Sequence, residues 1–362
     1  MIKRVAIVGV GLIGSSLGLA LGSIKEVEEI IGIDKNQDYL QEALTIGAVD
    51  KIASLEEGVR DVDLIILATP VGIITDLVTE ILPYISNKTI ITDVGSTKST
   101  LVRELEAIVE DHIYIGGHPM TGAETSGPSG ADKYLFENAI YVLTETNNTK
   151  HDSLIELKNI LERIGSQVLI LSPENHDKMV AVTSHLPHLI AVNLMNVIKQ
   201  FSQEDDKVTS LVAGGFRDTT RIAAGDPVMW RDIFLNNREM VLETIDIFEE
   251  QLKSLKELIL NNQSETLKET LAEIRDARIR LPMKKKGLLP SNFELIITLK
   301  DIPNAIGSMT SALGSEEINI QDIEVLKVRD EGGTIRLSFS QEWEQEEAYK
   351  LLKERSYKVI KK

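Results

Sequence analysis

The chain has 362 residues, enough for two or three hydrophobic cores, because domains usually contain about 100–200 residues each. It is acidic, with 56 Asp and Glu against 39 Lys and Arg, and it has no long basic run, which argues against nucleic acid as a partner. No cysteine is present, which excludes disulfides, thiolate metal sites and a cysteine nucleophile. The chain begins with a strand pattern instead of a signal peptide, and no segment approaches about 18 consecutive apolar residues. We therefore predict a soluble cytoplasmic protein with no membrane partner.

The first predicted elements form a dinucleotide-binding pattern. A β-branched strand, Val5–Val8, is followed by Gly9-Val-Gly11-Leu12-Ile13-Gly14, where a helix opens. The first glycine permits a tight turn, the second lets backbone N–H groups approach a pyrophosphate, and the third allows close helix packing. Asp34 ends a second apolar strand, where its carboxylate can accept hydrogen bonds from ribose hydroxyls and repel a 2′-phosphate. The pattern predicts NAD, held by Gly9, Gly11, Leu12, Ile13, Gly14 and Asp34, although Lys35 leaves NADP open.

Strand patterns alternate with helical patterns over residues 1–172. The predicted strands are Val5–Val8, Ile30–Ile33, Asp63–Leu67, Thr89–Thr92, Ile113–Ile115, Ala139–Leu143 and Val168–Leu171. This alternation predicts an α/β fold with a doubly wound, mainly parallel sheet of the Rossmann type. We expect this first domain to bind the dinucleotide.

Residues 173–281 have no strand pattern and form a predicted all-helical second domain. Ser172-Pro173 and Asp226-Pro227 each combine an N-cap residue with a proline at the first helical position. Apolar residues recur at helical spacing at Val241, Ile245, Phe248, Leu252, Leu255 and Leu258. Such a long stripe usually packs against another helix or another subunit, so we predict a substrate and dimerisation domain in a homodimer.

Residues 282–292 are a predicted linker, because two prolines flank a basic run there. Beyond it, residues 293–362 predict a small β-α-β-β-α-β unit. Its elements are strand Phe293–Leu299, helix Ala305–Leu313, strands Ile318–Val328 and Thr334–Ser340 around a Gly332-Gly333 turn, helix Glu344–Lys353 and strand Lys358–Ile360.

Polar loops follow three strands of the predicted sheet. They are Thr69-Pro70-Val71, Asp93–Lys98 and Gly116–Gly127. Open α/β sheets bind ligands at the carboxyl ends of their strands, so we expect the three loops to face one cleft. We place Thr69 and Pro70 beside the cofactor.

Two side chains of these loops are candidates for the chemistry. His118 lies in a glycine-rich loop after a strand, where it can exchange a proton with a substrate hydroxyl while a nicotinamide takes a hydride. The alternative is a capping or packing histidine, which we consider weaker because the neighbouring glycines suggest close backbone approach to a ligand. Ser96 either assists this chemistry or caps a helix that begins near Thr97.

The helical domain supplies two arginines, Arg217 and Arg221, four residues apart. One helical turn separates them, so both can point into the same cleft, where a guanidinium suits a carboxylate. The alternative is surface ion pairing with Asp218 or Asp226.

Two histidines of the helical domain, His185 and His188, stand three residues apart. No carboxylate at ligand spacing accompanies them, and Pro187 distorts that turn, so we predict no metal site. We expect them in the core or in the substrate pocket.

Several segments together resemble the bacterial prephenate dehydrogenase family of tyrosine biosynthesis. They are Gly9–Gly14, Asp93–Ser96, Gly117–Met120, Ser184–His188 and Gly215–Asp232. The resemblance implies oxidative decarboxylation of prephenate to 4-hydroxyphenylpyruvate with NAD. It implies that His118 interacts with the substrate's ring hydroxyl, that Ser96 assists, and that Arg221 binds the ring carboxylate. We predict further substrate-binding residues at Arg217, Glu124, His188 and Trp230; Ala123 replaces a family threonine beside Glu124.

The C-terminal unit resembles the ACT domain, a small module that binds amino acids and regulates metabolic enzymes. The resemblance rests on Leu299–Gly307 and Glu317–Ile320, with Pro303-Asn304 where the family commonly has Pro-Gly. It implies feedback inhibition by L-tyrosine, bound near Asp301, Asn304, Ala305, Ile306 and Asn319. A linked domain without coupling, or tyrosine binding at the active site, are the alternatives.

Other activities stay open at this point. Arogenate, with an extra amine, is an alternative substrate. A β-hydroxyacid dehydrogenase has a similar plan but usually relies on a lysine in the helical domain, and none occurs between Val208 and Leu252. A non-enzymatic sensor of NAD or an amino acid is another alternative. It would need only the nucleotide motif and the C-terminal unit, so the presence of the candidate catalytic residues His118 and Arg221 argues against it.

Overall fold

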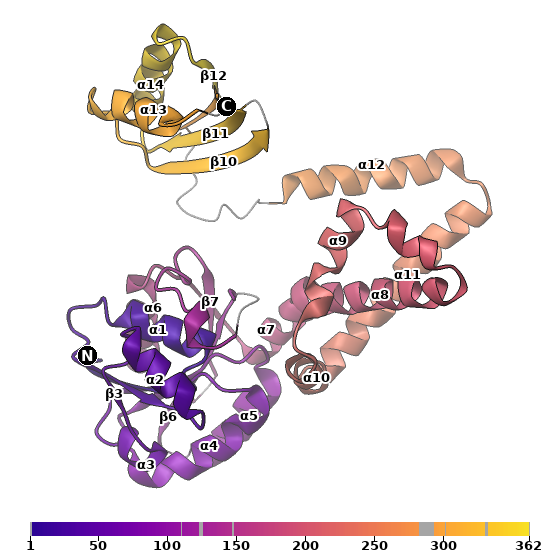
Figure 1. The fold of residues 1–362 in the computed structure, drawn as a ribbon. Helices are drawn as coiled ribbons and strands as arrows, with labels where there is room; N and C mark the ends of the chain where they lie inside the picture. Colours follow the sequence, from indigo (N-terminus) through magenta and orange to yellow (C-terminus); the bar gives the residue numbers. More distant parts are fainter. Residues whose placement is uncertain are drawn as a thin grey trace. The chain divides into compact units, whose positions relative to one another are not determined.

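The computed structural model of the chain describes residues 2–109, 111–122, 126–146, 148–281, 293–300, 302–329 and 332–361. They fall into two compact units, Met1–Arg280 and Leu281–Lys362, which are described separately (Figure 1). The predicted linker, residues 282–292, lies outside the described residues.

The first unit contains an eight-stranded sheet with the order β3-β2-β1-β4-β5-β6-β7-β8. Its strands are β1 (Arg4–Val8), β2 (Glu29–Ile33), β3 (Lys51–Ile52), β4 (Leu64–Leu67), β5 (Ile90–Asp93), β6 (Ile113–Pro119), β7 (Ile140–Thr144) and β8 (Gln167–Leu171). The first six strands pair in parallel, in the order of a dinucleotide-binding sheet with β1 at its switch point. The predicted doubly wound, mainly parallel sheet is confirmed.

Strand β6 changes partner along its length. Ile113–Ile115 pair with β5 in parallel, whereas Gly116–Pro119 pair with β7 in antiparallel register. The sequence-based prediction ended this strand at Ile115, because two glycines in succession are typical of a loop. That prediction was wrong, and His118 is a strand residue. Strand β3 was missed because two residues are too short to show a period.

Helices cover both faces of the sheet (Figure 1). On one face, α1 (Leu12–Leu21), α2 (Gln37–Thr45) and α6 (His151–Arg163) bury their apolar side chains in a common core. On the other, α3 (Leu55–Gly58), α4 (Ile74–Ile81) and α5 (Ser99–Ile108) pack into a second core. Because apolar residues face helices on both sides, the central strands are continuously buried.

The rest of the first unit is helical, as predicted. Its elements are α7 (Pro173–Val180), a π-helical turn η4 (Ala181–His185), α8 (Leu186–Glu204), η5 (Asp206–Leu211), α9 (Gly214–Thr220), η6 (Arg221–Ala224), α10 (Pro227–Asn236), α11 (Arg238–Leu260) and α12 (Ser264–Arg280). Ser172 caps α7 through the backbone N–H of Asn175, and Asp226 caps α10 through that of Met229, with a proline next in each case. Both predicted helix starts are therefore confirmed.

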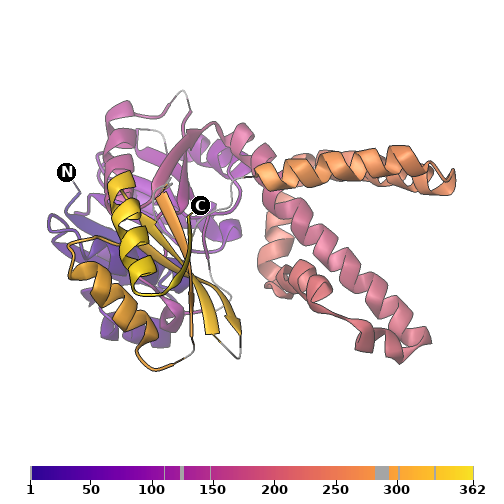
Figure 2. The ribbon, with the colours of Figure 1, turned by 90° about the horizontal axis from the view of Figure 1, so that it is seen from above.

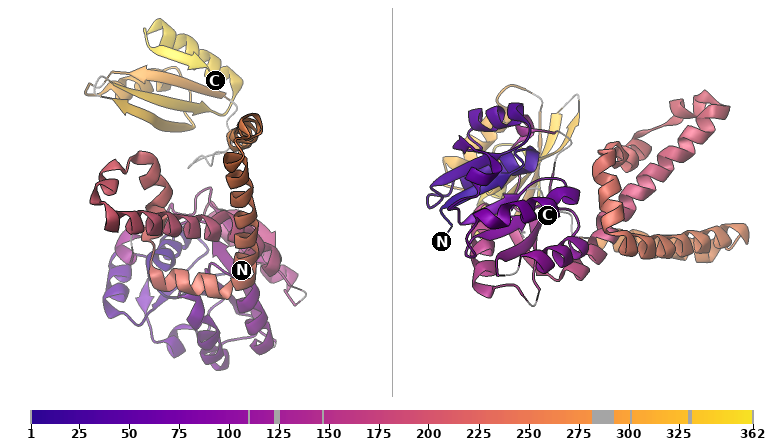
Figure 3. Two further views of the ribbon diagram at one scale, coloured as in Figure 1. Left: turned by 90° about the vertical axis from the view of Figure 1, so that its right-hand side faces the viewer. Right: turned by 90° about the horizontal axis from the view of Figure 1, so that it is seen from below.

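The two long helices α8 and α11 lie side by side at their amino-terminal ends and then diverge (Figures 2 and 3). By length and apolar composition alone, the stretch Pro173–Glu204 is long enough to cross a membrane. Its His176 and Asp177, however, are buried and hydrogen-bonded to the sheet domain, residues 2–171. The stretch is therefore packed into the folded unit at this end.

The second unit is a four-stranded sheet with two helices. Its elements are β9 (Phe293–Leu299), α13 (Ala305–Gly314), β10 (Asp322–Arg329), β11 (Gly332–Phe339), α14 (Glu342–Glu354) and β12 (Lys358–Lys361). The strand order is β10-β11-β9-β12, with every neighbouring pair antiparallel. Leu295, Ile297 and Leu337 alternate toward a separate core that includes Leu313 and Leu352 of the helices.

Two boundaries in this unit differ from the prediction. Strand β10 begins at Asp322 instead of Ile318, which leaves Asn319 in an exposed loop before it. Strand β11 begins at Gly332, so Gly332 and Gly333 belong to the strand instead of the turn. Apolar alternation continues past a strand end, and glycine is permitted in a strand, so neither boundary is marked in the sequence.

Candidate active site

The glycine-rich loop after β1 has the shape that a pyrophosphate requires. Gly9 has φ +96°, and a Cβ there would lie 2.5 Å from the Ala68 carbonyl oxygen. A Cβ on Gly14 would lie 2.0 Å from the Gly9 carbonyl oxygen, so only glycine lets α1 approach the strand. Gly11, in contrast, faces open space, because no other part of the described chain lies within 4 Å of the position that its Cβ would take. The residues therefore fit a dinucleotide that approaches the loop at Gly11 and the amino terminus of α1.

Asp34 lies directly after β2, next to the same loop. One carboxylate oxygen accepts the Val10 N–H at 2.9 Å, and the other accepts the Asn36 N–H at 2.8 Å. Each carboxylate oxygen can accept a second hydrogen bond, so the group is held in place with capacity left for two ribose hydroxyls. Thr69, after β4, contributes a buried Oγ1 that has no hydrogen-bond partner among the described residues, while Pro70 beside it is exposed.

His118 lies on the part of β6 that pairs with β7, opposite Val142. A Cβ on Gly117 would lie 2.4 Å from the Asp93 carbonyl oxygen, and one on Gly116 would lie 2.4 Å from Thr144 Oγ1. These glycines are therefore required by packing between strands, and our interpretation that they indicate a ligand was wrong for both.

A network of three side chains, the half-buried His118 and the buried His176 and Asp177, extends from β6 into α7. His118 Nδ1 and His176 Nε2 are 2.8 Å apart, and His176 Nδ1 lies 2.8 Å from a carboxylate oxygen of Asp177. Burial, with further contributions from His176, Lys98 and His185, holds the pKa of His118 well below its ordinary value of 6.5. His118 is therefore neutral at pH 7 and able to accept a proton.

Asp177 also caps a helix of the sheet domain. Its two carboxylate oxygens accept the backbone N–H groups of Lys98 and Ser99, each at 2.8 Å. Burial alone would raise the pKa of Asp177, but the hydrogen bonds from His176 and from these backbone groups outweigh it and lower this pKa. Helix α5 begins at Ser99, so Asp177 supplies the capping that we had considered for Ser96. Ser96 lies half-buried in the loop between β5 and α5.

A buried ion pair lies beneath this loop. Lys98 and Asp93 are both fully buried and form an ion pair, and the Tyr114 hydroxyl donates to the other Asp93 oxygen at 2.6 Å. The Gly95 N–H donates to Asp93 as well, at 2.6 Å. With each charge paired and hydrogen-bonded, the cluster fixes the loop that carries Ser96.

Three aromatic rings of the helical part lie together. His188 stacks on Trp230 with ring centroids 3.5 Å apart, and His185 meets the same indole edge-on at 6.2 Å. Burial lowers the pKa of His185 to about 4, and its Nδ1 lies 3.2 Å from Asn237 Nδ2. The structure therefore brings together the predicted residues His188 and Trp230. The π-helical turn η4 ends at His185, and such turns are frequent at functional sites.

The two candidate arginines are exposed. Arg217 lies on α9, which ends at Thr220, and Arg221 begins the 3₁₀ turn η6. The spacing predicted consecutive turns of one α-helix, and this prediction was wrong because the α-helix ends between the two residues. Glu124 lies outside the described residues.

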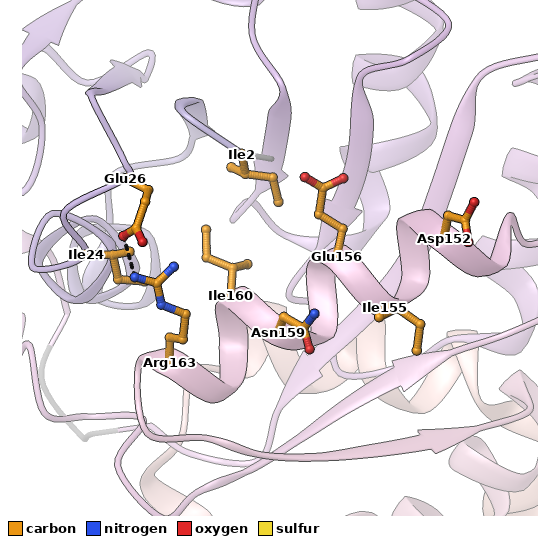
Figure 4. A pocket seen from close by; sticks show the side chains of 9 residues that line it. All are labelled: Ile2, Ile24, Glu26, Asp152, Ile155, Glu156, Asn159, Ile160 and Arg163. Atoms are coloured by element: carbon orange, nitrogen blue, oxygen red, sulfur yellow. Dashed lines mark hydrogen bonds and ion pairs between the residues drawn. The ribbon is translucent and has the colours of Figure 1, made fainter.

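A hollow of about 400 Å³ lies elsewhere on the sheet domain (Figure 4). It is lined by α6 residues such as Asn159 and Arg163, and by Ile2 and Glu26, which precede β1 and β2. These positions mark the amino ends of the parallel strands, whereas ligands of such sheets bind at the carboxyl ends. We therefore do not assign the cofactor or the substrate to this hollow.

Two family models match the first unit. The one described as "Prephenate dehydrogenase, nucleotide-binding domain" matches residues 17–170, and the one described as "Prephenate dehydrogenase, dimerization domain" matches residues 172–273. The prephenate dehydrogenase of Bacillus subtilis (strain 168) is 33% identical over 360 residues, which cover 98% of this chain and 97% of that protein. The chain belongs to the prephenate dehydrogenase family. As a member of this family it is an oxidoreductase.

Solved structures of the family share the fold of the first unit. The prephenate dehydrogenase of A. aeolicus, solved with hydroxyphenyl propionate and NAD+, superposes with a TM-score of 0.74 at 35% identity and covers 78% of this chain and 99% of that one. Synechocystis arogenate dehydrogenase gives a TM-score of 0.69 at 30% identity, over 77% and 99% of the two chains. A Rossmann-type domain followed by a helical domain is thus confirmed.

Sequence reasoning gave no role to His176, Asp177, Asp93, Lys98 or Asn237. The dipeptide His176-Asp177 follows a predicted helix start, and a carboxylate directly after a histidine in that helix is the signal that could have identified it. Asp93 and Lys98 carry opposite charges at the two ends of one short loop, and this arrangement is a sequence signal for an ion pair between them. Asn237 had none, because its role depends on how α11 packs against α7 and η4.

Proposed function

We propose that the chain catalyses the NAD-dependent oxidative decarboxylation of prephenate to 4-hydroxyphenylpyruvate. NAD is the cofactor, and it supplies a hydride acceptor when bound. The observation that carries the proposal is the neutral His118 at the carboxyl end of the sheet, on the strand next to β5 and two strands from β4. A base at this position can serve a substrate hydroxyl whose carbon loses a hydride.

The proposed roles of the chain's residues follow from charge and geometry. His118 accepts the proton of the ring hydroxyl as the hydride leaves the same carbon, which gives a ring ketone. The bond to the ring carboxylate then breaks, CO₂ leaves, and the electron pair makes the ring aromatic. The phenolate oxygen takes back the proton from His118, so the base is regenerated. Ser96 donates a hydrogen bond to the same oxygen, and Arg221 pairs with the ring carboxylate until it leaves.

The remaining predicted residues surround this centre in the proposal. Gly9, Gly11, Leu12, Ile13, Gly14, Thr69 and Pro70 hold the dinucleotide, while Arg217, Glu124, His188 and Trp230 line the substrate pocket. Both ring nitrogens of His188 are buried, and neither makes a hydrogen bond of good geometry to the described residues. Burial lowers the pKa of this ring, although the Ile222 backbone lies close enough to act in the opposite direction. The site next to Trp230 therefore suits a polar ligand. We propose that the enzyme works in the cytoplasm.

Arogenate remains the second candidate substrate, because a Synechocystis arogenate dehydrogenase shares the fold at 30% identity. Initial rates of NADH formation on prephenate and on arogenate test the proposal. We expect a higher kcat/KM with prephenate. A preference for arogenate would overturn the substrate assignment and leave the reaction class intact, whereas no NADH with either would overturn both.

The pH dependence of activity should report the environment of His118. Because its pKa is held well below 6.5, the neutral base persists at acid pH, and kcat/KM should fall only as the pH drops below the ordinary imidazole value. The lowered pKa shifts the fall to more acid pH than an unperturbed histidine would show. A profile of kcat/KM against pH, measured in buffers of constant ionic strength, checks this. An acid limb centred at or above 6.5 would contradict it.

Replacement of Asp34 by Ser should relax the preference for NAD over NADP, because it removes the negative charge that repels a 2′-phosphate. The ratio of kcat/KM values for NAD and NADP measures this. Asp38→Ser, in the first turn of α2 and exposed, is a matched control that removes the same charge nearby. An unchanged cofactor ratio in Asp34→Ser would place Asp34 away from the ribose.

Dimerisation through the helical domain is the proposed assembly. The matching family model is described as a dimerization domain. Large apolar side chains on α10, α11 and α12 are exposed in the single chain, among them Leu235 at 65%, Leu252 at 56% and Ile274 at 63%. The stripe predicted from the sequence is thus left uncovered at Leu252, which favours a second subunit over another helix of the same chain.

For residues 293–362 we propose an ACT-like regulatory domain that binds L-tyrosine. Asn304 precedes α13 in the left-handed conformation, with φ +66°, a region that asparagine and glycine tolerate best. It can therefore stand where the ACT family commonly has glycine. The proposed ligand contacts are Asn304, Ala305, Ile306 and Asn319; Asp301 also belongs to the prediction but lies outside the described residues.

A chain truncated after residue 290 should keep NAD-dependent activity and lose inhibition by tyrosine. The first unit ends at Arg280 and has its own cores, so its activity should survive the truncation. Allosteric couplings of about 1–3 kcal/mol change activity or affinity about 5–150-fold, which is the range expected for inhibition of the full chain. Inhibition curves of both chains provide the test. Equal sensitivity to tyrosine would place its site in the first unit.

A further inference from the structure

The hydrogen-bond geometry of His118, His176 and Asp177 indicates where the protons of the two imidazole rings lie. Asp177 is almost completely buried, and it accepts two backbone N–H groups at the start of α5. A carboxylate with these donors is ionised and can only accept hydrogen bonds. His176 Nδ1, 2.8 Å from it, must therefore carry a proton and donate it.

The same reasoning extends one step toward the active site. In the neutral form of His176, a proton on Nδ1 leaves a lone pair on Nε2, so Nε2 is the acceptor in that form. His118 Nδ1, 2.8 Å away, must then be the donor. His118 Nε2 is left unprotonated, and this is the nitrogen that a general base needs.

We propose that His176 and Asp177 are positioning residues that hold His118 in the tautomer with a free Nε2. When His118 takes up the substrate's proton on Nε2, its Nδ1–H still donates to His176, and Asp177 holds His176 in the accepting tautomer, so the ring keeps its orientation. The logic is that of a base oriented by a second group and a buried carboxylate. This inference rests on the proposed function of His118, and it adds two residues on α7, an element that was not expected to take part in the chemistry.

The surroundings of His118 lower its pKa. Burial has the largest effect, followed by His176, Lys98 and His185, and Lys98 is itself paired with the buried Asp93. His118 is linked to Asp177 through His176, which contacts both. A substitution of His176 is therefore the direct way to break the connection.

The proton positions can be measured in the resting protein. The chain has six histidines, so ¹H–¹⁵N correlation spectra of the full-length protein labelled with ¹⁵N-histidine contain few imidazole signals. His118→Asn and His176→Gln assign two of them by their loss. We expect both His118 and His176 to be protonated on Nδ1 at pH 8. A proton on Nε2 of His118 would overturn the proposal.

Two substitutions of His176 separate positioning from packing. In His176→Gln, Asp177 holds the amide NH₂, so the amide oxygen can still accept from His118 Nδ1. In His176→Leu, a side chain of similar size provides no acceptor. We expect kcat to fall about 10²-fold or more in His176→Leu, and about tenfold or less in His176→Gln, with KM for prephenate and the Kd for NAD nearly unchanged in both.

The control is His151→Gln, at an exposed position on α6, which should behave as the unmodified enzyme. Equal losses of kcat in the Gln and Leu variants, or a matching loss of NAD binding, would overturn the positioning role. If His176→Leu does not fold, the comparison of His176→Gln with the unmodified enzyme and the imidazole spectra still decide the question. If the enzyme uses neither prephenate nor arogenate, the proposed function fails, while the spectra test the tautomer independently.

Discussion

Replacement of His118 by Asn should lower kcat about 10²–10⁴-fold, the usual contribution of a positioned acid–base group. The amide NH₂ of Asn can donate to His176 Nε2 as His118 Nδ1 does, so the variant should fold and bind NAD. It cannot accept the substrate's proton. Steady-state kinetics with saturating NAD, together with NAD titration by fluorescence or calorimetry, provide the measurement.

The matched control for this variant is His151→Asn, which makes the same change at an exposed position at the start of α6. It should retain the activity of the unmodified enzyme. Turnover of His118→Asn within a fewfold of that value would remove His118 from the mechanism. A parallel loss of NAD binding would indicate a defect of the fold instead.

Replacement of Arg221 by Ala should raise KM for prephenate strongly and leave NAD affinity nearly unchanged. A hydrogen-bonded charge pair that is desolvated in the complex is worth about 2–5 kcal/mol when one partner is removed, which corresponds to about 30- to 5,000-fold. The side chain is exposed in the structure, and exposed pairs contribute about 1 kcal/mol or less. The size of the effect therefore tells whether substrate or a second subunit encloses Arg221.

Lysine should restore little at this position, because it cannot form the bidentate contact of a guanidinium with a carboxylate. Arg60→Ala is the control, since Arg60 is another exposed arginine, paired with Glu56 on the surface of the sheet domain. Kinetics with prephenate as the varied substrate measure both variants. Equal damage to KM for prephenate and to NAD affinity would contradict a carboxylate-binding role and indicate packing.

The nucleotide half of the site could be predicted from sequence because its requirements are local. Gly9 and Gly14 have no room for a side chain, Gly11 faces open space, and Asp34 follows the next strand. Each requirement falls on one residue at a fixed offset from a strand. The same is true of Ser172 and Asp226 as helix caps, where a side chain bonds to a backbone group three residues later.

The other half depends on contacts between distant segments. His176 meets His118 across 58 positions, and Asp177 reaches Lys98 and Ser99 across nearly 80, so no local pattern marks them. The hypothesis that Ser96 caps the helix considered only nearby residues. The cap is Asp177, which comes from the helical part of the chain. The continuation of β6 through Gly117 was missed for a similar reason, because the strand that it pairs with lies further along the chain.

The most direct test of the reaction follows the ring carboxylate of prephenate. With ¹⁴C at that carbon, the labelled CO₂ released should equal the NADH formed and the 4-hydroxyphenylpyruvate recovered, mole for mole. All three should fall together in His118→Asn. NADH formed without labelled CO₂, or CO₂ released at the same enzyme-dependent rate when NAD is omitted, would contradict an oxidative decarboxylation that begins at the hydroxyl facing His118.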